Sequence, residues 1–167
     1  EGESLFIFYA GHGDLLRDSA NRQVSYLIPQ DAVLGKPLTY LGGKDFLWSV
    51  QYSKARHILV VTDACYAGSL FRGLGSSGDQ PLSEKYEDLS RRLLSSGNKK
   101  VVPDESLFVQ YFLDALANNR NPFITAEKLV DGFKEKYNTD ANQLLQFLPI
   151  DSGVRPVRLC RRFEDYR

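Results

Sequence analysis

The chain has 167 residues, of which 43% are hydrophobic and 25% are charged. Such a chain supports one compact domain that buries roughly two thirds of its unfolded surface, which excludes a disulfide-dependent miniprotein and a disordered tail. Lysine and arginine total 21, as do aspartate and glutamate, so the formal net charge is zero and gives the chain no overall attraction to nucleic acid or to an anionic membrane.

The sequence also carries signals about location. No apolar run approaches the roughly 18 residues that a membrane-spanning helix requires, and the residues at positions 1–3 (EGE) lack the basic start of a secretion signal. Two cysteines are present, Cys65 and Cys160. Without a secretory context we expect a free thiol with a chemical role rather than a disulfide. These features predict a soluble, cytoplasmic protein.

The first part of the chain is predicted to form three strands and one helix. The strands are expected at residues 4–9, 24–28 and 57–63, and the helix is expected at residues 44–52, between the second and third strands. The first strand is a buried run closed by a glycine turn at residues 10–13, which places His12 at its end. The second strand stops before Pro29, as a hairpin or edge strand does. The third is apolar on both faces, as central parallel strands are, and Cys65 follows it.

The second part of the chain opens with a segment that lacks an apolar period. Residues 72–90 combine Gly and Ser clusters, Pro81 and alternating charges, which predicts an exposed loop or linker inside a single domain spanning residues 1–167. After it we expect strands at residues 92–97 and 155–159, an apolar helix at residues 105–118 and an amphipathic helix capped by Thr125. Four apolar residues share one side of that last helix: Leu129, Val130, Phe133 and Tyr137.

Alternating strands and helices predict an α/β fold, with a mostly parallel sheet covered by helices on both faces. In such sheets functional groups gather at the carboxyl ends of the strands, where both His12 and Cys65 are expected on neighbouring strands. The chain opens directly in a central strand, with no βα unit before it. Either the sheet is small, or N-terminal strands come from another polypeptide or were lost.

Cys65 and His12 suit nucleophilic catalysis. A thiol with a pKa near 8.5 is only a few per cent thiolate at neutral pH, so a nucleophilic cysteine needs an imidazole beside it. The same imidazole can protonate a leaving amine. Flanking glycines let backbone N–H groups approach an oxyanion, and Gly13 and Cys65 are the candidate donors. Taken singly, a cysteine is a small buried side chain and a histidine a turn residue, but the pair predicts a catalytic dyad.

Five segments, in this order, resemble caspase-like cysteine peptidases, closest to the bacterial and metacaspase branch: residues 8–13 (FYAGHG), 26–31 (YLIPQD), 63–68 (DACYAG), 96–97 (SG) and 106–109 (SLFV). His12 precedes Cys65 by 53 residues, close to the spacing of about 50 typical of caspases. The resemblance covers most of the chain. It implies a caspase-hemoglobinase fold, a Cys65/His12 dyad and a peptide bound as an extra strand beside Ser95, Ser96 and Gly97. In that family two strands and their helices precede the histidine strand, and they are absent from this sequence.

Asp63 stands two residues before the cysteine, so its side chain is expected on the same side of the strand as that of Cys65. The carboxylate either forms the base of a substrate pocket or accepts hydrogen bonds from nearby backbone N–H groups, and both interpretations remain open. In metacaspase-like enzymes an aspartate at this place binds Arg or Lys before the scissile bond, so the resemblance implies cleavage after basic residues. The nearest basic residues for self-processing are Arg72, Lys85, Lys99 and Lys100.

The leading hypothesis is a cysteine endopeptidase acting on protein or peptide substrates. The alternative is a non-catalytic interaction module or a subunit of a larger assembly, completed by a missing N-terminal segment or another subunit. We expect no metal, because His57 and Cys65 bracket one strand and lie roughly 26 Å apart. We expect no cofactor either, because the glycine pattern at residues 73–78 does not open a helix.

Overall fold

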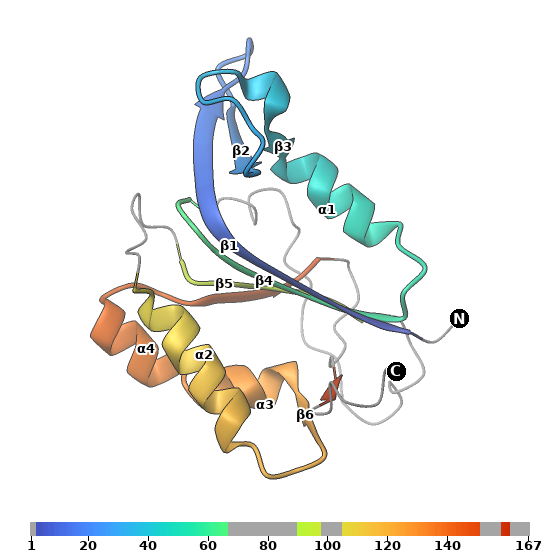
Figure 1. The fold of residues 1–167 in the computed structure, drawn as a ribbon, viewed down its shortest axis with the longest axis vertical. Coiled ribbons are helices and arrows are strands. Elements are labelled where there is room, and N and C mark those ends of the chain that lie inside the picture. The colour runs from blue at the N-terminus through green and yellow to red at the C-terminus, as the bar shows by residue number, and fades with distance from the viewer. Residues whose placement is uncertain (1–2, 67–89, 98–104, 151–157, 161–167) are drawn as a thin grey trace.

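The computed structural model of the protein describes residues 3–66, 90–97, 105–150 and 158–160. Its main sheet has six strands in the order β3-β2-β1-β4-β5-β7 (Figure 1). Their bounds are Leu41–Gly42 (β3), Gln23–Ile28 (β2), Ser4–Arg17 (β1), His57–Ala64 (β4), Ser90–Ser95 (β5) and Gln146–Pro149 (β7). A separate two-stranded sheet pairs Phe123–Thr125 (β6) with Arg158–Cys160 (β8). The helices are Gly43–Gln51 (α1), Leu107–Asn118 (α2), Ala126–Asp131 (α3) and Lys134–Ala141 (α4), with a short 3₁₀ turn at Pro37–Thr39.

The architecture is α/β, with an open mixed sheet flanked by helices. β4 pairs in parallel with β1 on one side and with β5 on the other, whereas the other three neighbouring pairs are antiparallel. The expectation of a mostly parallel sheet is therefore wrong. A tight connection, in which the carboxylate of Asp18 accepts the N–H groups of Ala20 and Arg22, joins β1 to β2, and so short a connection allows only an antiparallel pair.

β1 is longer than the sequence predicted. Residues 4–11 pair with β4, and residues 12–17 pair with β2. The strand therefore runs through the predicted glycine turn at residues 10–13, and His12 lies inside β1 rather than at its end. The backbone stays extended because β2 takes over as its partner where the pairing with β4 stops.

The first half of β1 is also less buried than the sequence predicted. Phe6 and Phe8 are 40% and 41% exposed, although both rings lie against Phe112 of α2. Their aromatic character predicts a buried strand, but burial depends on what covers the strand. Among the described residues, α2 covers these rings only in part.

Two apolar layers hold the helices against the sheet, because successive side chains of β4 point to opposite faces. Ile58 and Val60 pack under α1, whereas Leu59 and Val61 pack under α2, α3 and α4. All four side chains are at most 1% exposed. Figure 1 shows the same arrangement, with α1 on one side of the sheet and the other three helices on the opposite side. The central strand β4, which directly precedes Cys65, is thus packed against helices on both faces.

The helices after β5 begin at side-chain caps. α2 starts at Leu107 rather than at residue 105, because the hydroxyl of Ser106 accepts the N–H of Val109 at 3.3 Å. Thr125 caps α3 as predicted, accepting the N–H of Lys128 at 3.2 Å. The single amphipathic helix expected after this cap is two helices.

The break between α3 and α4 falls at Gly132 and Phe133. The backbone of Phe133 leaves helical values, with φ at −136°, and a new helix starts at Lys134. The four apolar residues expected on one side of a single helix are nevertheless all buried. The break lets both short helices turn their apolar sides onto the sheet.

The remaining predicted elements fall partly outside the described residues. The strand expected at residues 92–97 is β5, which begins earlier, at Ser90. Most of the predicted loop at residues 72–90 lies outside the described ranges, as do residues 155–157 of the predicted last strand. β8 pairs with β6 and not with the main sheet. In the described part of the chain, none of the helices has the length and apolar character needed to cross a membrane.

Candidate active site

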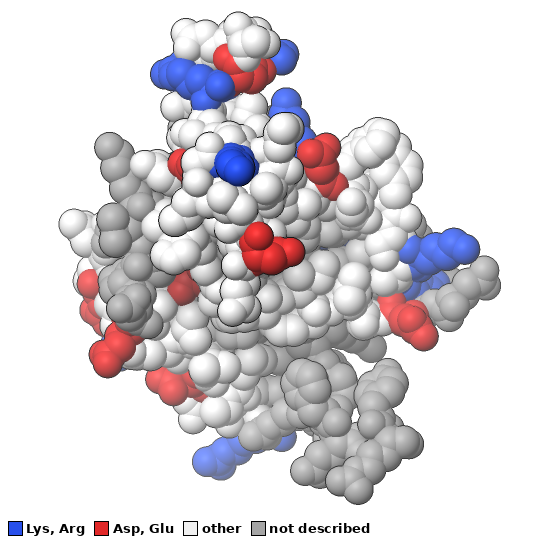
Figure 2. Space-filling model, turned by 45° about the horizontal axis from the view of Figure 1, so that its top comes forward, with Lys and Arg blue, Asp and Glu red and all other residues white. Residues whose placement is uncertain are grey.

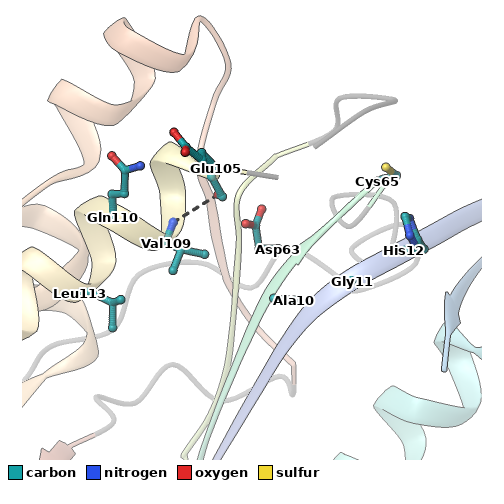
Figure 3. Close-up of a pocket in the computed structure, with 10 residues that line it drawn as sticks. Ala10, Gly11, His12, Asp63, Cys65, Glu105, Val109, Gln110 and Leu113 are labelled. Carbon is teal, nitrogen blue, oxygen red and sulfur yellow. Dashed lines mark hydrogen bonds between the residues drawn. The ribbon is translucent and has the colours of Figure 1, made fainter. Parts of the chain in front are cut away.

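Cys65 and His12 lie beside one another because of how β1 and β4 pair. The parallel register ends with Gly11 opposite Ala64, so each of the two functional residues comes one position beyond this last pair. Both line a cleft of about 530 Å³ at the end of the parallel strands (Figure 3). Cys65 is a free, half-buried thiol, and His12 is exposed. No hydrogen bond joins these two described side chains.

The backbone around Cys65 demands a glycine at position 13. A Cβ atom built on Gly13 would come within 2.1 Å of the carbonyl oxygen of Cys65, closer than real Cβ contacts allow. The backbone of β1 therefore touches the backbone of the turn that carries the thiol. Tyr66, the next residue, has a φ of 57°, a left-handed conformation that non-glycine residues rarely adopt and that is typical of turns at functional sites.

The hydroxyl of Tyr9 orients the peptide bond between His12 and Gly13. It lies 2.7 Å from the carbonyl oxygen of His12 and 2.9 Å from that of Ile28, and it accepts the N–H of Ile28 at 3.1 Å. Burial raises the pKa of Tyr9, against the effect of the hydrogen bond at Ile28, so the hydroxyl keeps its proton at neutral pH.

The direction of the Gly13 N–H follows from that bond. The chain has no cis peptide bond among its described residues, and in a trans peptide the C=O and the next N–H point in opposite directions. Because the His12 carbonyl faces the Tyr9 hydroxyl on the β2 side, the Gly13 N–H faces the side of β4 and Cys65. This is the direction required of an oxyanion donor. The sequence analysis missed Tyr9, and its place three residues before the histidine carried no signal of this role.

Asp63 is a buried acidic residue in the same cleft. It is 3% exposed, and its Oδ1 has no hydrogen-bond partner within the described chain. It shares the face of β4 that carries Val61 under α2, and it lines the cleft together with Cys65. An orphaned oxygen favours the pocket-floor interpretation of Asp63 over the backbone-cap interpretation, because a cap would satisfy its carboxylate oxygens.

The opposite wall of the cleft comes from α2 and the residues just before it, which the sequence analysis left unassigned. This wall consists of Glu105, Ser106, Val109, Gln110 and Leu113. The helix itself was predicted, and residues 106–109 belong to the segments that resemble caspase-like peptidases. Nothing in the local pattern showed which side of the helix would face the strand ends.

Ser95, Ser96 and Gly97 are not among the described residues that line the cleft. Ser95 is paired with Thr62 of β4 on one edge and with Gln146 of β7 on the other. Ser96 donates its N–H to Thr62 at 3.1 Å. A peptide strand beside these residues would have to displace such bonds, so their role in substrate binding stays a prediction that this arrangement does not favour.

A buried network holds the end of β5 in place. The carbonyl of Ser96 accepts hydrogen bonds from the Tyr137 hydroxyl at 2.5 Å and from the Gln143 side-chain amide at 2.6 Å. Burial raises the pKa of Tyr137 to about 12, against the hydrogen bond from Gln143, and the negative charge of Asp63 adds to the increase. The cleft aspartate thus acts electrostatically on the network under β5.

On the face shown in Figure 2, acidic and basic side chains are interspersed among uncharged ones. Neither sign of charge therefore dominates this face.

Comparison of the chain with protein-family models and with curated proteins finds no match.

Proposed function

We propose that the protein is a cysteine endopeptidase with a Cys65/His12 dyad. The observation that carries this proposal is the common cleft: two neighbouring parallel strands bring a free thiol and an imidazole to its rim, and the Gly13 backbone packs against the Cys65 carbonyl. Few structural roles require a cysteine, a histidine and a glycine at one such edge, whereas acyl transfer uses all three.

The chemistry runs in two steps. His12 takes the proton from the thiol, and the sulfur of Cys65 attacks the peptide carbonyl while the N–H groups of Gly13 and Cys65 stabilise the oxyanion. His12 returns the proton to the leaving amine, and the C–N bond breaks. Water, activated by His12, then hydrolyses the thioester and frees the thiol. Asp63 binds a basic side chain before the scissile bond.

The caspase-hemoglobinase fold is part of the same proposal. Its support is the parallel core β1-β4-β5, with the candidate histidine and cysteine on adjacent strands and helices on both faces. The motif order in the sequence agrees with this assignment. The antiparallel β2-β3 extension beyond His12 adds to the core without altering the cleft.

The test is hydrolysis of fluorogenic peptides that end in arginine or in aspartate. We expect turnover of the arginine peptide, and we expect Cys65→Ala and His12→Ala each to lower kcat/KM by about 10³-fold or more. The double variant should lose little further, because residues that act as a unit are non-additive. Cys160→Ala, which removes the other cysteine, is the matched control and should keep its activity. Hydrolysis that persists in Cys65→Ala would contradict the dyad.

A second candidate function follows from the open edge of β1. The carbonyl of Glu3 accepts the N–H of Arg56 beside β4, so the alternating backbone groups of Ser4, Phe6 and Phe8 face the other edge, where the described chain places no strand. An added strand from a preceding segment or another subunit would fit there, as in other cases of strand addition. The interaction-module alternative is favoured if no peptide shows hydrolysis that depends on Cys65.

A further inference from the structure

Among the described residues that line the cleft there are two carboxylates and no lysine or arginine. Asp63 is the last residue but one of β4, and Glu105 lies two residues before α2, so they come from opposite walls of the same cleft. In Figure 3 Asp63 lies between Cys65 and Glu105. Asp63 is buried, whereas Glu105 is exposed. The two negative groups thus extend from the reactive sulfur toward the mouth of the cleft.

Asp63 itself points to a cationic ligand. Asp63 is 3% exposed, and its Oδ1 has lost hydration that no described donor replaces. Burying a charge is costly unless a partner compensates it, so a bound cation is the natural completion of this site. Val109 and Leu113 of α2 line the same cleft and offer an apolar wall for the methylene stem of a long basic side chain.

We propose that Glu105 completes this subsite, so that the cleft selects arginine over lysine; this inference rests on the proposed peptidase function. A guanidinium group is planar and carries five N–H donors along several edges, so it can bond Asp63 with one edge and Glu105 with another. A lysine ammonium is a compact point charge that satisfies one carboxylate well and the second poorly. Glu105 therefore determines the preference for arginine over lysine, whereas Asp63 attracts both side chains.

Binding to the Cys65→Ala chain tests the inference without requiring turnover. Three peptides that differ only in one residue, arginine, lysine or the neutral isostere citrulline, are titrated by calorimetry at fixed ionic strength. We expect arginine to bind about tenfold more tightly than lysine, and citrulline to bind most weakly. Adding Glu105→Gln should weaken arginine binding about tenfold and bring the arginine-to-lysine ratio close to one.

Glu3→Gln is the matched control. It removes the same charge from an exposed glutamate at the opposite end of the parallel strands, and it should leave all three affinities unchanged. Asp63→Asn should weaken arginine and lysine binding alike. An unchanged arginine-to-lysine ratio in Glu105→Gln, or equal binding of arginine and citrulline, would overturn the inference. Failure of the proposed function is seen separately, as the absence of any peptide hydrolysis by the wild-type chain that depends on Cys65.

Discussion

Because Gly13 has no side chain, β1 can come close to the turn at Cys65, and this close approach brings the two residues of the proposed dyad together. Gly13 follows His12 directly, and its α-carbon faces the carbonyl of Cys65 so closely that a methyl group has no room. A glycine beside a catalytic histidine is commonly explained by backbone flexibility. Here close approach is the reason, since β1 keeps Gly13 in extended pairing with Leu27.

Replacing Gly13 with alanine should therefore separate β1 from the turn at Cys65. We expect kcat/KM to fall by at least about 100-fold, because displacing an oxyanion donor costs this much in other enzymes. Gly132→Ala is the control, since it lies in helical backbone and its added Cβ would meet the Leu129 carbonyl oxygen at 3.3 Å, a tight contact that a small shift relieves. Peptide hydrolysis, with circular dichroism to confirm folding, makes the measurement. Full activity of Gly13→Ala would show that the close approach has no catalytic role.

Tyr9 acts on the site through one peptide bond. Tyr9→Phe removes the hydroxyl that holds the His12 carbonyl, so the Gly13 N–H loses its fixed direction. We expect kcat to fall about 10- to 100-fold with little change in KM, because an oxyanion donor stabilises only the transition state. Tyr52→Phe, on an exposed part of the chain, is the control. A change in KM alone, or a loss of stability without a change in kcat, would assign Tyr9 a purely structural role.

At the scale of elements, the positions of β1, α2 and β5 are all set by their contacts with β4. Parallel pairing with β1 sets the relative position of His12 and Cys65, and the cap at Ser106 sets where the second wall of the cleft begins. β5 pairs on the other side of β4 and is secured from beneath by Tyr137 and Gln143. The described walls of the cleft thus come from β1, β4 and α2 and the residues beside them, whereas β5 supports β4 from its other edge.

The anchor under β5 predicts a distinct response to alkaline pH. The folded pKa of Tyr137 is about 12, above its ordinary value of 10.0, so the folded chain holds this proton more tightly than the unfolded chain. The corresponding stabilisation is complete below pH 10 and is lost as pH rises toward 12. The stability advantage of the wild type over Tyr137→Phe should therefore shrink across this range. Urea unfolding of both chains at several pH values measures the difference, and an advantage independent of pH would refute the prediction.

At the scale of the whole molecule, helices cover both faces of the sheet, and the described residues place no strand along the outer edge of the first half of β1. α1 covers one face and three helices cover the other, while Phe6 and Phe8 remain partly exposed near the open edge. An edge of this kind is a place where natural proteins usually add a strand or a covering segment. The catalytic and the interaction hypotheses are compatible at this scale, since the edge and the cleft use different parts of β1.

Self-processing is a prediction about the whole chain. A peptidase with a preference for basic residues should cut its own polar segment after the cysteine, and the candidate sites are Arg72, Lys85, Lys99 and Lys100, which lie outside the described residues. Mass spectrometry of freshly purified chains should show fragments ending in Arg or Lys in the wild type and none in Cys65→Ala. Identical fragments in both would point to a contaminating protease. Wild-type fragments ending at Asp79 or Asp88 would contradict the basic subsite.

The sequence by itself determined the features that depend on near neighbours. The strand predicted at residues 57–63 is β4 with one further residue, and the strand predicted at residues 24–28 is β2. Thr125 caps a helix as expected, because a cap bonds an N–H only three residues away. The placement of Cys65 directly after a central strand follows from the same local pattern of apolar residues.

Only the tertiary structure decided which distant segments meet. β1 continues past its glycines because β2 offers it a second partner, and Ser95 is enclosed because β7 returns beside β5. Glu105 reaches the cleft of Asp63 because α2 packs its apolar side onto β4, a contact between residues about forty positions apart. The periodicity of apolar residues predicts that a helix or strand has an apolar side. Which other element that side packs against depends on the packing of all elements together.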